Sequence, residues 1–222
     1  MIIKQMSAVI FDMDGVLVDS EPVYMRRFLQ FMQAHQIALE DESYRKTVGW
    51  SSRMTWQWAL SYWPEAISMT QLQELYRAYW KERPVRYDEV LDQDALPVLN
   101  QLRREGVRTA LASSSPRSAI DQMLSQCGLT AYFDVIVSGE QFVKSKPDPE
   151  IYRYTAIQLG LPCSRCLAVE DSTVGIAAAA AAGMYVLAKQ DRRFGFDQSQ
   201  AQQSIQRLCE ILDVMKAKEI HI

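Results

Sequence analysis

The stretch AVIFDMDGVLVDS spans residues 8–20, and its apolar start is followed by two aspartates, Asp12 and Asp14, that one methionine separates. An apolar run of this kind is typical of a strand that is buried on both faces. An unpaired carboxylate buried at the end of such a strand costs several kcal/mol, so this pair needs a cationic partner. The stretch therefore predicts a buried strand over 8–11 and an acidic site directly after it.

Four more short apolar runs recur along the chain, each flanked by turn or helix signals. Helical patterns over 116–126, 148–160 and 176–182 separate the last four runs, and Ser115 is the predicted N-cap of the first of these helices. Strand–helix alternation predicts an α/β fold with a doubly wound parallel sheet. The five predicted strands are 8–11, 107–112, 135–137, 166–169 and 185–188.

Residues 20 to about 87 interrupt this alternation, because they contain helical patterns and no convincing strand. The patterns cover 25–33 and 71–81, and Thr70 with Gln73 fits a capping box for the second helix. We therefore predict an inserted all-helical cap domain over 18–88, within an α/β core domain formed by 1–17 and 89–222.

The inserted segment also holds all five tryptophans: Trp50, Trp56, Trp58, Trp63 and Trp80. A small helical domain needs large side chains to form a core of its own, and this is our interpretation of the cluster. The alternative is that one of them, Trp50 first, stacks against a sugar.

Composition excludes several classes of function. The 222 residues are 48% hydrophobic with a net charge of −3, which suits a packed globular chain and gives no basic excess for nucleic acid. No run approaches the roughly 18 apolar residues of a membrane span, and no signal peptide is recognisable. We expect a cytoplasmic protein, a monomer, without nucleic-acid or membrane partners.

Few residues are available for nucleophilic catalysis that depends on histidine. The sequence has two histidines, His35 and His221, so a Ser-His-Asp or Cys-His mechanism is poorly supplied. Cys163 and Cys166 form a CxxC without a second pair, which is half of a zinc site, and we expect reduced thiols. Carboxylates or a metal must therefore carry any acid–base chemistry.

Polar residues follow the predicted strands, at the edge of the sheet where α/β proteins bind ligands. Converging carboxylates repel one another unless a hard cation lies among them, and Mg²⁺ takes a few carboxylates together with phosphate oxygens. Hydroxyls and a lysine are groups that bind a phosphate. The sequence thus predicts that the first two aspartates face Mg²⁺ and a phosphoryl group. The residues at these ends are Asp12, Asp14, Ser113, Ser114, Ser115, Lys144, Lys146, Glu170 and Asp171.

These residues resemble the motifs of the haloacid dehalogenase superfamily over nearly the whole chain. The motifs are DMDGV at 12–16, LASSS at 111–115, SKPDPEIY at 145–152 and VEDSTVGIAAAAAAGM at 169–184. The inserted segment resembles the helical cap of the subgroup that contains β-phosphoglucomutase and many sugar-phosphate phosphatases.

The resemblance implies a five- or six-stranded parallel sheet and a role for each motif residue. Asp12 would be the nucleophile that forms an aspartyl-phosphate, and Asp14 the general acid and then the general base. Mg²⁺ would bind the Asp12 side chain, the Asp14 carbonyl and Asp171, with Glu170 in or beside that set. Three further groups would hold the phosphoryl group of a small phosphorylated metabolite: Ser113, the amide near Ser114, and Lys146.

Two departures from the family pattern bear on the reaction. Tyr24 stands where the mutase and many relatives have histidine, and Arg53 is one residue away from the arginine of the mutase's substrate loop. We therefore expect a Mg²⁺-dependent phosphatase, with Arg53 as a substrate contact, and keep a β-phosphoglucomutase-type phosphomutase as the alternative. A dehalogenase, a phosphonate hydrolase and a non-catalytic binding protein on the same scaffold fit the motifs less well.

Overall fold

The structure is a computed structural model that describes residues 6–48, 50 and 52–219. The chain divides into two compact units, Met1–Asp19 with Tyr87–Ile222 and Ser20–Arg86. We call the first the α/β unit and the second the helical unit. The predicted division at 18 and 88, and the role of the insert as a cap, stay predictions.

A parallel sheet forms the centre of the α/β unit. Among the described residues it has six strands in the order β3-β2-β1-β4-β5-β6, and each neighbouring pair is parallel. The predicted α/β class is therefore confirmed. The sequence patterns missed β6, because an exposed edge strand with one buried apolar residue, Ile205, has no apolar run. The strands are β1 (Ala8–Phe11), β2 (Arg108–Ser113), β3 (Val135–Ser138), β4 (Cys166–Glu170), β5 (Tyr185–Lys189) and β6 (Gln203–Ile205).

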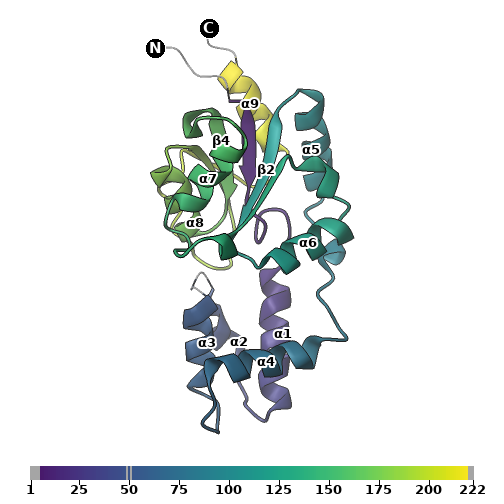
Figure 1. Cartoon of the computed structure of the whole chain (residues 1–222), viewed down its shortest axis with the longest axis vertical. Helices are drawn as coiled ribbons and strands as arrows, with labels where there is room; N and C mark the ends of the chain where they lie inside the picture. Colours follow the sequence, from purple (N-terminus) through teal and green to yellow (C-terminus); the bar gives the residue numbers. More distant parts are fainter. Residues whose placement is uncertain (1–5, 49, 51, 220–222) are drawn as a thin grey trace. The chain divides into compact units, whose positions relative to one another are not determined.

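Helices cover both faces of this sheet. Figure 1 shows α7 and α8 on one side of the strands and α5 and α6 on the other. Ile10, Ala112, Tyr152 and Ile176 belong to one buried cluster, so strands and helices on the α7 and α8 side share a core. The helices are α5 (Ala95–Arg104), α6 (Arg117–Gln126), α7 (Glu150–Gln158), α8 (Thr173–Ala181) and α9 (Glu210–Glu219), with short 3₁₀ turns η1 (Tyr87–Glu89), η2 (Thr130–Tyr132), η3 (Gly139–Gln141) and η4 (Cys163–Arg165).

The predicted N-cap of α6 is wrong by one residue. The cap is Pro116 and the helix begins at Arg117, so Ser115 lies outside it. The Ser115 amide donates to Ser113 Oγ over 3.0 Å, and its hydroxyl donates to an aspartate described below. Tertiary contacts therefore occupy the serine that the local pattern assigned to the helix.

The helical unit contains α1 (Glu21–Ala34), α2 (Asp41–Arg45), α3 (Ser52–Leu60) and α4 (Met69–Trp80). Its described residues have a core of their own, formed by Phe28, Phe31, Met32, Tyr44, Ala59 and Leu72. Trp56, Trp58 and Trp63 pack against this core, which confirms the interpretation for these three tryptophans, and Trp80 is buried as well. Trp50 is 41% exposed, and its contact with a sugar stays a prediction.

The predicted capping box of α4 is also wrong. The helix begins two residues earlier, and Ser68 with Gln71 forms the box through the Gln71 N–Ser68 Oγ and Ser68 N–Gln71 Oε1 bonds of 3.2 and 2.8 Å. The sequence offers the same spacing twice. The earlier register places Ile67 before the cap and Leu72 four residues after it, and both pack in the core.

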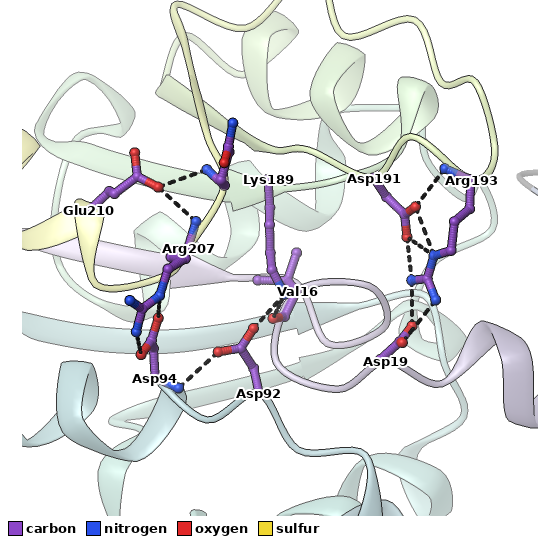
Figure 2. A network of polar contacts seen from close by, with 10 residues as sticks. Val16, Asp19, Asp92, Asp94, Lys189, Asp191, Arg193, Arg207 and Glu210 are labelled. Atoms are coloured by element: carbon purple, nitrogen blue, oxygen red, sulfur yellow. Dashed lines mark hydrogen bonds and ion pairs between the residues drawn. The ribbon is translucent and has the colours of Figure 1, made fainter.

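Polar contacts in the α/β unit join the loop after β1 to β5 and its following loop. Lys189 Nζ donates to Val16 O over 2.9 Å and to Asp92 Oδ2 over 2.7 Å (Figure 2). Arg193 donates to both carboxylate oxygens of Asp19, and to Asp191. These bonds hold residues 16–19 against β5 and the loop that follows it.

Two further findings concern the cysteines and the length of the apolar helices. All four cysteines are free, as expected for a chain with reduced thiols. None of the helices in the described ranges is long and apolar enough to cross a bilayer.

Candidate active site

The register of β1 and β4 brings together three acidic side chains from distant parts of the chain. Phe11 pairs with Val169, so the next residue of each strand, Asp12 and Glu170, lie side by side at the carboxyl end of the sheet. Asp171 follows directly. One carboxylate oxygen from each of the three lies within 4.8 Å of the others, and all three residues are buried. We call this set the acidic cluster.

Lys146 is the cation that the acidic cluster needs. Its side chain is only 4% exposed, and Nζ lies 2.6 Å from both Asp12 Oδ1 and Glu170 Oε1. A third bond of 3.0 Å joins Nζ to the Ala112 carbonyl. A lysine before a proline is usually a solvated loop residue, but here the loop before α7 carries the ammonium into the site. Lys146 is therefore one cationic partner of the kind that the paired aspartates in the sequence were predicted to need.

One ammonium cannot neutralise two buried carboxylates, and this imbalance of charge shifts the pKa values of the groups in the cluster. Burial raises the pKa of Asp12 from 3.8 to about 7; Lys146 opposes the change, and Glu170 and Asp14 add to it. Burial alone would lower the pKa of Lys146, but Asp12 and Glu170 raise it well above its usual range. Lys146 therefore stays charged, while the cluster retains an unbalanced negative charge that a further cation would neutralise.

Asp14 lies outside the acidic cluster. Among the described residues the group of three carboxylates does not include it. Its Oδ2 instead accepts a 2.6 Å hydrogen bond from the Ser115 hydroxyl. The two aspartates of the DMDGV motif thus have different surroundings: Asp12 lies beside the lysine and the other carboxylates, whereas Asp14 is held by a neutral hydroxyl.

The remaining predicted residues have mixed outcomes. Ser113 is buried at the end of β2, where its Oγ accepts from the Ser115 amide, so the serine shapes the turn. Ser114 is exposed at the same strand end. Arg53 is exposed in α3 of the helical unit, and its contact with substrate stays a prediction, as do the roles of Ser113 and Ser114.

Two glycines allow the acidic side chains to lie where they do. A Cβ on Gly15, which has a φ of +76°, would lie 2.0 Å from Asp171 Oδ2. A Cβ on Gly175 would lie 2.0 Å from Glu170 Oε1. Both distances are shorter than any real contact, so any larger residue at these positions would displace a carboxylate.

Two residues make site contacts that the sequence did not predict, although Ser115 stands among the polar residues at the strand ends. Ser115 was assigned to a helix cap, and Tyr152, within the SKPDPEIY motif, was given no role. The Tyr152 hydroxyl donates to Glu170 Oε1 over 2.6 Å from a wholly buried position in α7. A buried tyrosine is ordinarily a core residue, and no local sequence signal predicts which group its hydroxyl contacts.

The donor set of the acidic cluster suits a metal ion. Carboxylate oxygens are the ligands that hard divalent cations such as Mg²⁺ take, and three lie close together here. The unbalanced negative charge described above gives a second reason for the cluster to attract a cation.

This combination of fold and site, a parallel α/β sheet with carboxylates and a lysine at its carboxyl edge, defines an α/β enzyme. Residues 6–183 match the family described as haloacid dehalogenase-like hydrolase. Because the match covers most of the chain, this protein belongs to that family and is a hydrolase.

Comparison with individual proteins agrees with the family. The chain is 31% identical over 182 residues to a phosphorylated carbohydrates phosphatase of Thermotoga maritima, covering 81% of this chain and 82% of the relative. It is 28% identical over 188 residues to the β-phosphoglucomutase of Bacillus subtilis, covering 82% of each. The crystal structure of CbbY from Rhodobacter sphaeroides in complex with phosphate has the same fold, with a TM-score of 0.77 at 23% identity over 93% of this chain and 96% of that chain.

Proposed function

We propose that this protein is a Mg²⁺-dependent phosphatase that hydrolyses a small phosphorylated metabolite, a sugar phosphate, through an aspartyl-phosphate on Asp12. The contact of Lys146 with Asp12 in the buried acidic cluster carries the proposal. A lysine that stays charged favours the anionic, nucleophilic form of Asp12 and can receive the negative charge of an incoming phosphoryl group. Similarity to a relative named for phosphorylated carbohydrates supports the substrate class.

Two displacements make up the reaction. An Asp12 carboxylate oxygen attacks phosphorus, the bond from phosphorus to the sugar oxygen breaks, and Asp14 gives its proton to the leaving oxygen. Water then attacks the aspartyl-phosphate, Asp14 takes a proton from it, and the bond between phosphorus and Asp12 breaks to release phosphate. Ser115 holds the Asp14 carboxylate for both transfers.

We assign Mg²⁺ to the Asp12 and Asp171 side chains and to the Asp14 carbonyl. When bound, the ion would neutralise charge on the phosphoryl oxygens. Ligation predicts that Mg²⁺ raises the thermal midpoint of the wild-type protein, because a ligand of the folded state alone stabilises it. Asp171→Asn should abolish that rise, whereas Asp121→Asn, which changes an exposed aspartate on α6, should leave it intact.

Phosphate release from p-nitrophenyl phosphate and a panel of sugar phosphates tests the activity. We expect turnover by the wild-type protein with Mg²⁺, and a loss of about a thousandfold or more in Asp12→Asn, because the nucleophile is removed. Asp121→Asn again serves as the matched control. A folded, Mg²⁺-loaded protein that hydrolyses no member of a broad panel would contradict the proposal.

A phosphomutase is the second candidate, favoured by the 28% identity to β-phosphoglucomutase. Tyr24 and the shifted Arg53 weigh against it, as the sequence showed. Incubation with β-glucose 1-phosphate and a sugar bisphosphate primer separates the two: a mutase yields glucose 6-phosphate, whereas a phosphatase yields free phosphate.

A further inference from the structure

Tyr152 touches both members of the buried ion pair between Lys146 and Glu170. Its hydroxyl donates to Glu170 Oε1 over 2.6 Å, and Lys146 Nζ lies 5.0 Å from the centroid of its ring. The side chain is wholly buried on the face of α7 that packs against the sheet. Helix packing therefore determines where the phenol lies, and the phenol in turn contacts the lysine and its carboxylate.

Both oxygens of Glu170 accept hydrogen bonds. Oε1 accepts from Lys146 and from Tyr152, each over 2.6 Å, and Oε2 accepts from the Ser172 hydroxyl over 3.2 Å. Gly175 lies so close behind the carboxylate that a Cβ there would overlap Oε1, Cδ and Oε2. The Glu170 carboxylate is therefore confined, with Oε1 held by both the lysine and the tyrosine.

Lys146 is held by three acceptors that match its three ammonium protons: Asp12 Oδ1, Ala112 O and Glu170 Oε1. Ala112 is backbone, and Asp12 is the proposed nucleophile. Glu170 is thus the side chain whose orientation selects where the ammonium lies relative to Asp12, and Tyr152 and Ser172 orient Glu170.

We propose that Tyr152 is a positioning residue, which holds Lys146 on Asp12 by orienting the Glu170 carboxylate, and that Glu170 acts in this chain as the partner of the lysine. The inference rests on the proposed phosphatase function and adds two roles to it. Without the phenol hydroxyl, Glu170 Oε1 loses a donor and the carboxylate can rotate. Lys146 then spends less time at the distance from which it supports the attack by Asp12.

Tyr152→Phe tests this role, because it removes one oxygen and keeps the ring. We expect kcat to fall about tenfold, the usual consequence of losing one charge-assisted hydrogen bond, with KM changed by less than about twofold. Tyr132→Phe is the matched control, since it removes a 3.1 Å phenol hydrogen bond to Asn100 away from the site. The control should keep wild-type kcat, and thermal melts should show both variants folded at the assay temperature.

A double-mutant cycle separates positioning from a structural role. If Tyr152 acts through Glu170, the double variant Tyr152→Phe with Glu170→Gln has the kcat of Glu170→Gln alone, within about twofold. A structural role predicts instead that the two losses multiply. Multiplied losses, or a kcat for Tyr152→Phe equal to that of the control, would overturn the inference.

Crystal structures of the wild type and Tyr152→Phe give a readout that needs no activity. We expect the Glu170 carboxylate to turn and Lys146 Nζ to leave hydrogen-bonding distance of Asp12 Oδ1 in the variant. An unchanged lysine would overturn the positioning role even in an active enzyme. An inactive wild type whose Lys146 still moves in the variant would overturn the phosphatase proposal and leave the positioning role supported.

Discussion

The Ser115 hydroxyl donates a 2.6 Å hydrogen bond to Asp14 Oδ2, although 101 positions separate the two residues in the chain. The bond joins the loop after β1 to the loop after β2, and parallel pairing of these neighbouring strands makes the approach possible. Of the two aspartates in the DMDGV motif, Asp14 is therefore the one that accepts from the Ser115 hydroxyl, which suits the acid and base role that we propose for it.

Removing this donor should impair catalysis more than stability. We expect Ser115→Ala to lower kcat about tenfold, because Asp14 loses a hydrogen bond that helps to hold its carboxyl group in place. Ser118→Ala changes an exposed serine of α6 and should keep wild-type kcat. Steady-state kinetics with Mg²⁺ measures the difference, and equal kcat values for the two variants would contradict the assigned role of Ser115.

The raised pKa of Asp12 predicts how stability without divalent cations depends on pH. Because folding raises this pKa from 3.8 to about 7, the folded state binds the proton more tightly than the unfolded state does. The resulting stabilisation is complete below the unfolded value and is lost as pH rises to about 7. Asp12→Asn has no proton to lose, so its free energy of unfolding should fall less between these limits, by a difference of a few kcal/mol.

Urea denaturation in EDTA at about pH 5 and about pH 8 measures this difference, and subtraction of the variant removes the contribution of all other groups. Saturating Mg²⁺ should restore much of the loss at the higher pH, since the ion neutralises the same carboxylates. If the free energies of unfolding of wild type and Asp12→Asn changed in parallel with pH, Asp12 would have the same pKa in the folded and unfolded states, which would contradict the prediction.

Gly175 is required for the position of Glu170. An alanine ordinarily stabilises a helix by about 1 kcal/mol relative to glycine, yet a Cβ here would lie 2.0 Å from Glu170 Oε1. We expect Gly175→Ala to displace the carboxylate and lower kcat by about tenfold or more, because Lys146 loses an acceptor. Val174→Ala changes volume in the same turn of α8 and provides the control. Wild-type kcat in Gly175→Ala would show that Glu170 can move without consequence.

The ion pairs of Arg193 with Asp19 and of Lys189 with Asp92, both drawn in Figure 2, should differ in their contribution to stability. Arg193 and Asp19 have side chains that are 45% and 50% exposed, and Arg193 keeps its ion pair with Asp191 when Asp19 is replaced, so Asp19→Asn should lower the free energy of unfolding by less than about 1 kcal/mol. Lys189 and Asp92 are 15% and 18% exposed, and Lys189 also donates to Val16 O. Lys189→Met should therefore cost more, about 3 kcal/mol, since it leaves a carboxylate and a carbonyl partly buried without their donor.

Urea unfolding of the two variants in parallel tests this ranking at one ionic strength. Added salt should reduce the effect of Asp19→Asn further and change that of Lys189→Met little, because exposed charges are screened more strongly. A larger loss in Asp19→Asn than in Lys189→Met would contradict the burial argument.

Much of the fold could be predicted from pattern alone. Strands that are buried on both faces, such as β1 and β4, appear in the sequence as continuous apolar runs, and the patterns located five of the six described strands. The errors lie where local signals are ambiguous. Ser68 and Thr70 each begin a capping pattern, and only the packing of Ile67 and Leu72 selects the first.

The candidate site could likewise be predicted only in part. Residue types at strand ends indicated Asp12, Lys146 and Asp171 before any geometry was known, because carboxylates after buried strands need a cation. The contacts of Tyr152 and Ser115 depend on the register of β1 against β2 and β4, and on the packing of α7 onto the sheet. No short window of sequence contains that information.

The sequence by itself determined the α/β class, the helical insert and the positions along the chain where charge accumulates, since each depends on residues that are near neighbours. Only the tertiary structure decided which charges meet. The tertiary structure places the Lys146 ammonium between Asp12 and Glu170. It also brings the Ser115 hydroxyl to Asp14 and the Tyr152 hydroxyl to Glu170. The physical reason is that hydrogen bonds and ion pairs act over about 3 Å, a separation that strand register and helix packing set between residues far apart in the chain.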